Sequence, residues 1–413
     1  MKENKTKPDI RFKGFTEAWE QRKLGEVVEF YNGDRSSRYP TDSDIVPDGI
    51  PFINAGDLVS GRVKLDTANK ITKEKYNELS GAKIQRGDII YCLRGTLGKN
   101  AFIDNFDSGT VASSLVDIRP KKIVGKYLFQ VLNSDIEYRQ RTINDEGAAQ
   151  PNLSAKNLSL FDIPMSNKDE QTKIAEYFSN LDNLITLHQR ECDQLKELKK
   201  SMLKKMFPRD ESSIPEVRFA GFTDAWEQRK LIDLCDYVDY RGKTPNKSDS
   251  GIFLVTAKNV KDGYIDYDVS KEYIPEDKYE EVMRRGKPKI GDVLITTEAP
   301  CGNVAQVNKP NIALAQRIIK YRGHNQVIDN TYLKYYLLSP FFQNILNMKS
   351  SGGTVQGIKG SVLHQQKISF TKYTEQLKIG QCLDSLDSLI TLHQRELEIL
   401  KNLKKTCLKR MFI

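Results

Sequence analysis

The sequence is poor in the residues that usually build metal, redox and membrane sites. It has only four histidines, and none of its six cysteines forms a C-x-x-C pair. Scattered cysteines of this kind favour reduced, buried thiols over a zinc or disulfide site. No run of about 18 apolar residues is present, and the first residues contain no apolar signal-peptide core. We therefore expect a cytoplasmic protein without a metal site or a membrane-spanning helix.

The motifs of the common nucleic-acid enzymes are also missing. No two prolines are adjacent, so the N/D-P-P-Y/F motif of adenine methyltransferases is absent, and there is no H-E-x-x-H. Residues 241–244 (RGKT) resemble the end of a phosphate-binding loop, but Tyr237 stands where that loop needs glycine. Glu197 and Lys199 have nuclease-like spacing within a helical pattern, where a surface charge pair is the better interpretation. We expect no catalytic residues and no cofactor in this chain.

The most informative feature is an internal repeat. The octapeptide LITLHQRE occurs at residues 184–191 and again at 389–396. The agreement extends to the Glu-Gln pairs at 170–171 and 375–376 and to the Met-Phe pairs at 206–207 and 411–412. The period is far too long for a solenoid, so the sequence indicates a duplicated domain.

Each repeat begins with an arm, at residues 8–24 and 215–231. From Gly14 and Gly221 onward the two arms differ only by Glu17 in place of Asp224. The bodies between arm and octapeptide share little beyond landmarks such as the Gly-Asp pairs at 87–88 and 291–292. Equal arms and helices suggest one kind of partner bound twice, whereas unequal bodies suggest two different targets.

Both octapeptides lie in heptad patterns that predict coiled-coil helices. With Leu181 and Leu386 at position a, the predicted seam consists of Leu181, Leu184, His188, Leu195, Leu198, Leu386, Leu389, His393, Leu400 and Leu403, with Glu191, Met202, Glu396 and Cys407 completing the a and d positions. Two roles are open to the histidines: proton carriers beside the glutamates, or polar residues that fix register and antiparallel orientation. The second is preferred. Pro208 is expected to end the first helix after Phe207, and the second helix to run to the last residue.

The bodies have the pattern of a mixed α/β fold with twisted sheets. Strand-like runs occur at 88–93 and 292–296, bounded by glycine and asparagine turns. Single short helices are predicted at 126–139 and 332–348.

The whole arrangement resembles the specificity subunit of a type I restriction-modification enzyme. The resemblance is carried by the duplicated F-x-x-A-W-E-Q-R-K-L arms, the E-Q-x-K-I and LITLHQRE helices and the divergent bodies. It implies two target-recognition domains separated by two long antiparallel helices in a pseudo-two-fold repeat, each domain binding one half of a split, asymmetric DNA site. It also implies docking of two methyltransferase subunits and, through them, restriction subunits, with S-adenosylmethionine, ATP and magnesium on those partners. The expected boundaries are an arm at 1–15, target-recognition domain 1 at 16–168, a central helix at 169–207, a linker at 208–220, target-recognition domain 2 at 221–373 and a distal helix at 374–413.

A net charge of +9 and a pI of about 9.0 are compatible with double-stranded DNA as the ligand. Direct contact with base edges needs Arg, Lys, Asn, Gln or Ser/Thr on loops. In the first body the candidates are Arg35, Ser36, Arg38, Arg94, Thr96, Lys99, Gln150 and Asn152. In the second they are Arg241, Lys243, Thr244, Lys258, Asn259, Gln316, Arg317, Ser351, Thr354 and Gln356. The alternative function is a non-enzymatic coiled-coil scaffold whose bodies bind protein.

Overall fold

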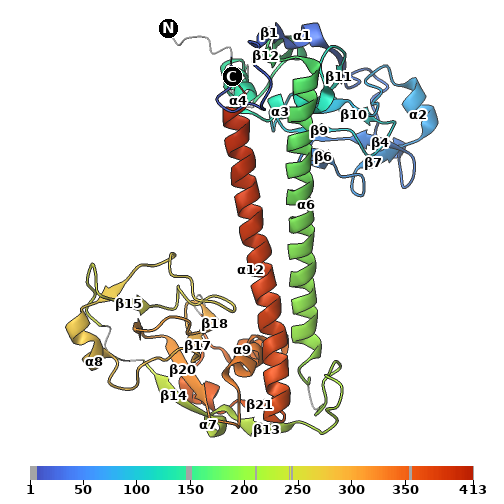
Figure 1. Cartoon of the computed structure of the whole chain (residues 1–413). Helices are drawn as coiled ribbons and strands as arrows, with labels where there is room; N and C mark the ends of the chain where they lie inside the picture. Colours follow the sequence, from blue (N-terminus) through green and yellow to red (C-terminus); the bar gives the residue numbers. More distant parts are fainter. Residues whose placement is uncertain are drawn as a thin grey trace. The chain divides into compact units, whose positions relative to one another are not determined.

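A computed structural model describes residues 7–145, 151–209, 212–240, 242, 245–352 and 356–412. The chain forms two compact units: unit 1 contains residues 1–188 and 395–413, and unit 2 contains residues 189–394. Two long helices, α6 (Lys168–Lys205) and α12 (Tyr373–Arg410), each contribute one segment to each unit (Figure 1). Neither helix has a stretch apolar enough to cross a bilayer within the described ranges.

Unit 1 is built around two four-stranded sheets. The first is antiparallel, in the order β2 (Val28–Asn32), β11 (Leu115–Pro120), β8 (Ile89–Cys92), β9 (Asn100–Phe102). The second has the order β10 (Thr110–Val111), β4 (Ile50–Ile53), β7 (Asn69–Ile71), β3 (Ile45–Val46). Two small sheets pair β1 (Glu20–Lys23) with β12 (Asp162–Met165) and β5 (Leu58–Val59) with β6 (Arg62–Val63). Short helices are α1 (Leu24–Val27), α2 (Lys73–Glu78), α5 (Ala155–Ser159), η1 (Asp42–Asp44) and η2 (Ala55–Asp57).

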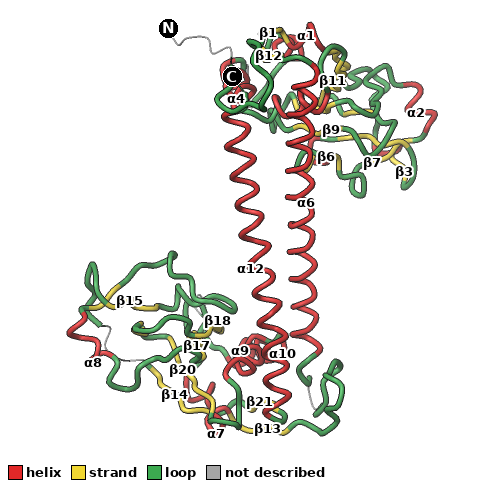
Figure 2. The backbone as a smooth tube through the Cα atoms, viewed as in Figure 1, coloured by secondary structure: helices red, strands yellow, loops and turns green. Residues whose placement is uncertain are grey.

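Unit 2 has a similar arrangement of strands and short helices, with three strands in its second sheet (Figure 2). Its main sheet has the order β14 (Cys235–Asp239), β20 (Ile318–Gly323), β17 (Val293–Thr297), β18 (Cys301–Gln306), and the next has β16 (Tyr273–Ile274), β15 (Ile252–Val255), β19 (Ile312–Leu314). The arm strand β13 (Glu227–Lys230) pairs with β21 (Lys367–Phe370), and the short helices are α7 (Leu231–Leu234), α8 (Tyr279–Val282), α11 (Gly360–His364) and η3 (Glu276–Lys278). The mixed α/β fold with two sheet-rich domains and long helices is confirmed.

The two predicted short helices are each split in two. Unit 1 has α3 (Gly125–Val131) and α4 (Asp135–Ile143), and unit 2 has α9 (Asn330–Leu338) and α10 (Pro340–Lys349). A serine caps the second helix at each break: Ser134 Oγ accepts from the backbone N–H of Ile136 at 3.3 Å, and Ser339 Oγ accepts from that of Phe342 at 3.3 Å. In unit 2, Pro340 also prevents α9 from continuing. Serine competes with the helical backbone for hydrogen bonds and therefore favours the start of a new helix.

The helix segments are antiparallel within each unit. In unit 1, Tyr177 lies near Cys407 (Oη to Sγ 3.5 Å), Asp182 pairs with Lys404 (2.6 Å) and His188 pairs with Glu396 (3.3 Å), so later residues of α6 meet earlier residues of α12.

Unit 2 has the same order. His393 pairs with Glu191 at 3.4 Å and Asp387 with Lys199 at 2.5 Å. The predicted antiparallel helices are confirmed in each unit separately.

The predicted coiled-coil seam is wrong at heptad position d. Position a behaves as expected, since Leu181 and Leu386 are buried and Leu195 and Leu400 half-buried, as are His188 and His393. The leucines assigned to position d are exposed, however: Leu184 at 44%, Leu198 at 43%, Leu389 at 43% and Leu403 at 41%. The residues one place later face inward instead, namely Ile185, Cys192, Ile390 and Leu397. Leu184-Ile185 and Leu389-Ile390 offer two adjacent apolar residues, so the sequence pattern alone did not fix the register.

Both long helices end earlier than predicted, at Lys205 and Arg410. The Met-Phe pairs that follow are buried. Phe412 contributes to the core of unit 1, where its ring lies 5.6 Å from Tyr127 and 6.0 Å from Phe178. Phe207 contributes to unit 2, 5.6 Å from Tyr332 and 6.4 Å from Trp226. Each unit is therefore completed by the helix end of the other repeat.

Candidate DNA-recognition loops and helix surface

The identical parts of the two repeats form the same buried junction. In unit 1, the Glu170 carboxylate is fully buried at the start of α6. It accepts hydrogen bonds from Arg11 Nε (2.6 Å) and Nη2 (2.8 Å) and from Trp19 Nε1 (3.0 Å). We call Arg11, Trp19 and Glu170 the Glu170 cluster. It connects the arm to the helix and raises the pKa of the Arg11 guanidinium, because its charged form is hydrogen-bonded to Glu170.

The Glu375 cluster of unit 2 consists of Arg218, Trp226 and Glu375. Glu375 is also fully buried and accepts from Arg218 Nε at 2.7 Å and Nη2 at 2.8 Å. Here Thr371 Oγ1 donates to the second carboxylate oxygen at 2.5 Å, and buried Trp226 Nε1 has no hydrogen-bond partner among the described residues. The neighbouring glutamines act alike, since Gln171 accepts from the backbone N–H of Val124 and Gln376 from that of Asp329, each at 2.9 Å. The repeated Glu-Gln motif is therefore explained by the junction of arm, body and helix.

In unit 1, most of the predicted DNA-contacting loops meet at one edge of the main sheet. The guanidinium of Arg94, which follows β8, donates to Asn152 Oδ1 at 3.1 Å. Arg35 Nη2 donates to the carbonyl of Ser113 at 3.3 Å, just before β11. Lys99 Nζ donates to the carbonyl of Ala55 at 2.8 Å and is half-buried. Loops far apart in sequence are thus brought together, with Arg94 and Arg35 exposed.

Unit 2 brings the corresponding loops together. Glu298, which follows β17, forms an ion pair with Arg317 at 3.2 Å, and both side chains are about half exposed, at 44% and 51%. The β-bridge between Glu298 and Gly357 joins the loop that contains Gln356. The candidates Ser36, Arg38, Thr96, Lys258, Ser351 and Gln356 are all exposed, and Gln316 is half-buried.

One predicted DNA contact is wrong. Asn259 is fully buried: its Oδ1 accepts from the backbone N–H of Thr256, and its Nδ2 donates to the carbonyls of Asp266 and Ser270. It stabilises a loop and cannot reach a base. Gln150, Arg241, Lys243, Thr244 and Thr354 lie outside the described residues.

Each main sheet carries a cluster of largely buried charges on or directly before its strands. In unit 1, Arg119 binds Asp88 through two nitrogens at 2.8 and 3.0 Å, and Asp117 Oδ2 lies 3.5 Å away. Burial, and then the charge of Asp88, raises the pKa of Asp117 to about 8.

In unit 2, Arg322 binds Asp292 in the same way, at 2.6 and 2.7 Å. Lys320 takes the place of Asp117, and burial lowers its pKa. The two bodies therefore share a frame but differ in buried charge.

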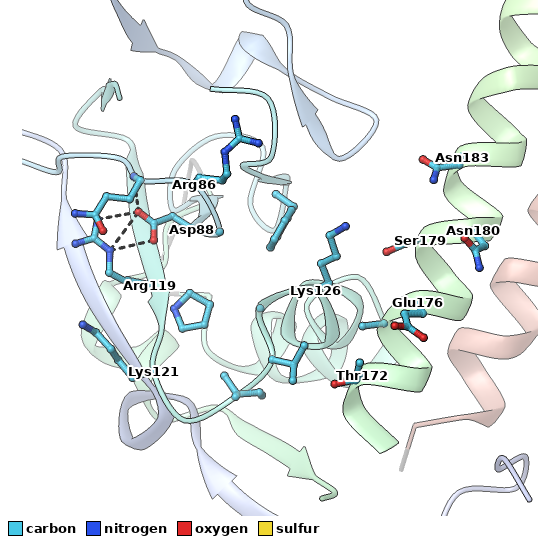
Figure 3. A pocket seen from close by; sticks show the side chains of 18 residues that line it. Arg86, Asp88, Arg119, Lys121, Lys126, Thr172, Glu176, Ser179, Asn180 and Asn183 are labelled. Atoms are coloured by element: carbon cyan, nitrogen blue, oxygen red, sulfur yellow. Dashed lines mark hydrogen bonds and ion pairs between the residues drawn. The ribbon is translucent and has the colours of Figure 1, made fainter. Parts of the chain in front are cut away.

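A recess of about 930 Å³ lies in unit 1 between the sheet and α6 (Figure 3). Asp88 and Arg119 stand on one wall, and Glu176 and Asn183 on the helix side, with Lys126 between them. A second recess of about 450 Å³ shares Lys126 and Asn183 with it. Among the predicted DNA-contacting residues that the structure describes, none lines either recess.

The former d positions belong to an exposed apolar stripe on the long helices. In unit 1 the stripe consists of Leu184, Leu187, Ile399 and Leu403, and in unit 2 of Leu198, Leu389 and Leu392, all between 41% and 66% exposed. Leu187 and Leu392 are the same residue of the repeated octapeptide. Exposed apolar side chains grouped in this way are typical of surfaces that bind another protein.

The described residues thus form two related sheet bodies with unlike exposed loops, each joined to segments of the duplicated helices. The model of the family described as "Type I restriction modification DNA specificity domain" matches residues 16–197 and again 223–402. The chain belongs to this family and is a specificity subunit of the type I restriction-modification class, whose role is DNA recognition rather than catalysis.

Similar proteins include one relative by sequence and two solved chains that share the fold. The type I restriction enzyme MjaVIII specificity subunit of Methanocaldococcus jannaschii is 24% identical, over 94% of this chain and 91% of its own. The crystal structure of the type I restriction-modification S subunit from M. genitalium matches with a TM-score of 0.65 at 16% identity, covering 98% of this chain and 99% of that one. A chain from a study of complex assembly and conformational transition of the type I R-M system matches with a TM-score of 0.51 at 18% identity, covering 94% and 96%.

Proposed function

We propose that the chain recognises a two-part, asymmetric DNA site, with one body contacting each half, and that it docks two methyltransferase subunits and, through them, restriction subunits. The observation that carries the proposal is the contrast between the two units. Their Glu170 and Glu375 clusters are built alike, while their exposed recognition loops carry different charges at equivalent positions. Base-specific contacts require such exposed polar side chains, and two unlike sets suit two unlike half-sites.

The apolar stripe supports docking of a partner twice. It recurs on the repeated octapeptides, and an apolar helix face binds another helix well. If a methyltransferase subunit covers Leu187 and a second copy covers Leu392, Leu187→Glu and Leu392→Glu each remove one partner. The double variant then removes both.

The test is the mass of the purified complex. Sedimentation should give two methyltransferase subunits per chain, one in each single variant and none in the double variant. Glu197→Gln, an exposed position of α6 outside the stripe, is the control. Retention of both subunits by the double variant would overturn this docking surface.

Cofactors are assigned to the partners as part of the same proposal. S-adenosylmethionine, ATP and magnesium belong to the methyltransferase and restriction subunits, and the chain alone binds none of them. Isothermal titration of the isolated chain with each ligand tests this, and saturable binding of any of them would contradict it.

DNA recognition is tested by selecting duplexes from a random library with the complex of this chain and its methyltransferase subunits. The proposal expects enrichment of two unlike short motifs separated by a fixed gap. Enrichment of no motif, with the complex intact, would favour a protein-binding scaffold.

A further inference from the structure

Strand register makes Glu298 of unit 2 the structural equivalent of Arg94 of unit 1. In unit 1, Leu93 N donates to the carbonyl of Ser114, and Leu153 N donates to the carbonyl of Leu93, each at 2.9 Å. In unit 2, Thr297 N donates to the carbonyl of Arg317, and Ile358 N donates to the carbonyl of Thr297, again at 2.9 Å. The next residues, Arg94 and Glu298, each form a β-bridge with the same loop, to Asn152 and Gly357.

The side chains at this shared position have opposite charge. The Arg94 guanidinium donates to Asn152 Oδ1 at 3.1 Å, whereas the Glu298 carboxylate binds Arg317 Nε at 3.2 Å. In unit 1, Ser114 takes the place of Arg317. A half-exposed carboxylate in a DNA-recognition loop would be repelled by phosphate, so contact with the DNA backbone does not explain it. A carboxylate does suit the amino group of cytosine, and arginine suits guanine O6 and N7.

Arg317 is also held in an uncommon backbone conformation. Its φ is +71°, in the left-handed region that non-glycine residues seldom occupy. Such positions concentrate at functional sites, where the surrounding structure holds them. Here the carbonyl of Arg317 is bonded to the strand while its guanidinium extends to Glu298, so that both charged groups sit at the sheet edge.

We propose that the Glu298–Arg317 pair recognises a C·G base pair in the major groove of the half-site contacted by unit 2. Glu298 accepts from cytosine N4, and Arg317 donates to guanine O6 and N7. The inverted G·C pair is rejected most strongly. The Glu298 carboxylate would then face the acceptors O6 and N7 of guanine, and the Arg317 guanidinium would face the amino donor of cytosine. In unit 1, Arg94 occupies the same position and contacts a guanine of the other half-site. This inference rests on the proposed DNA recognition.

The experiment is library selection with the complex of the full chain and its methyltransferase subunits, at one fixed salt concentration. Wild type is expected to select C·G at one position of one half-site. Glu298→Gln should reduce the preference for C·G over G·C at that position about 10- to 100-fold, since glutamine can also donate to guanine. Its non-specific DNA affinity should stay equal or rise, because a negative charge is removed, whereas a merely misfolded loop would lower it.

Two further variants complete the design. Arg94→Gln should alter the opposite half-site only. Glu281→Gln is the matched control, because Glu281 forms a similar exposed ion pair with Lys278 at 3.3 Å in unit 2 outside the recognition loops. An unchanged motif for Glu298→Gln, with wild type still selecting two half-sites, overturns this inference and leaves the proposed function intact. Changes in the same half-site by both variants overturn it too. Absence of any motif for wild type refutes the proposed function itself.

Discussion

The buried junctions and the exposed loops of the two units have diverged to very different extents. Glu170 and Glu375 receive the same two bonds from an arm arginine, and Phe412 and Phe207 fill the same place in the two cores. The loop position occupied by Arg94 in unit 1 carries Glu298 in unit 2. The arm–helix junctions therefore depend on the same buried arginine–carboxylate pair in both units, while the loop position at the sheet edge varies in charge without a change of fold.

The largest effect is expected where one repeat completes the core of the other. Phe207→Ala should destabilise unit 2, and Phe412→Ala unit 1, each by about 3–5 kcal/mol through loss of a buried ring. Urea unfolding followed by hydrogen exchange in each unit is the measurement. If Phe412→Ala destabilised unit 2 and left unit 1 unchanged, the core of unit 1 would not depend on the helix end of the second repeat.

Substitution within the buried ion pairs should cost somewhat less but sharpen the equivalence of the junctions. Glu170→Ala leaves Arg11 without its buried partner and should destabilise unit 1 by about 3 kcal/mol, because the Arg11 side chain is 12% exposed and water can reach it. Glu375→Ala should do the same in unit 2. Asp169→Asn, an exposed neighbour of Glu170, is the control for denaturant unfolding. If the free energy of unfolding fell no more than in the control, the Glu170 cluster would not stabilise unit 1.

A difference in pH dependence should separate the two bodies. Asp117 has a raised pKa in the folded state. Between about pH 4 and about pH 8 it is therefore protonated in the folded protein, whereas an unfolded aspartate, with a pKa of about 4, is ionised. Its contribution to stability is therefore complete at acid pH and declines by up to about 1.4 kcal/mol per pH unit until the pH passes the raised value. Unit 2 has Lys320 at this position and lacks this decline.

Asp117→Asn should thus flatten the pH dependence of unit 1 between pH 5 and about 8. Chemical denaturation of the variant and the wild type across this range is the check. The groups that face Asp117 are Asp88 and Arg119. An equal slope in both proteins would mean that Asp117 is ionised in the fold.

The smallest effect is expected for the ion pairs between the helix segments. Lys404→Ala in unit 1 and Lys199→Ala in unit 2 each remove one partly exposed pair, with Asp182 and Asp387 respectively. Each should cost about 1 kcal/mol or less, because solvent screens such pairs. Thermal unfolding in low and high salt measures it, and a large salt-independent loss would contradict a surface role.

The sequence was sufficient for the repeat, the two bodies and the long helices, because eight identical residues and a heptad pattern are strong signals. It was not sufficient for the register, since Leu184 and Ile185 are both apolar and only packing decides which is buried. In unit 1 the helical pattern continues across Ser134, so the sequence does not reveal the split there. In unit 2 the sequence does carry a signal, because Pro340 follows Ser339 and favours the start of a new helix. Each hydroxyl caps the following helix.

The candidate site was predicted by residue type, and that is where the prediction was weakest. The residue type makes Asn259 a possible base contact, but its side-chain amide hydrogen-bonds to three backbone groups of its own loop. Glu298 was missed because an acidic residue does not fit the expectation of a basic DNA surface. Only the strand register, which matches Leu93 with Thr297, reveals that Glu298 and Arg94 share one position.

Exchange of one body is the most direct test of whether each body recognises its own half of the DNA site. Residues 25–167 are replaced by the corresponding segment of a relative with a different site, and the motif bound by the complex with its methyltransferase subunits is determined again. If each body contacts one half of the site, the exchanged chain will select a new sequence in one half and the wild-type sequence in the other. A change in both halves, or in neither, would contradict recognition by two independent bodies on a common frame.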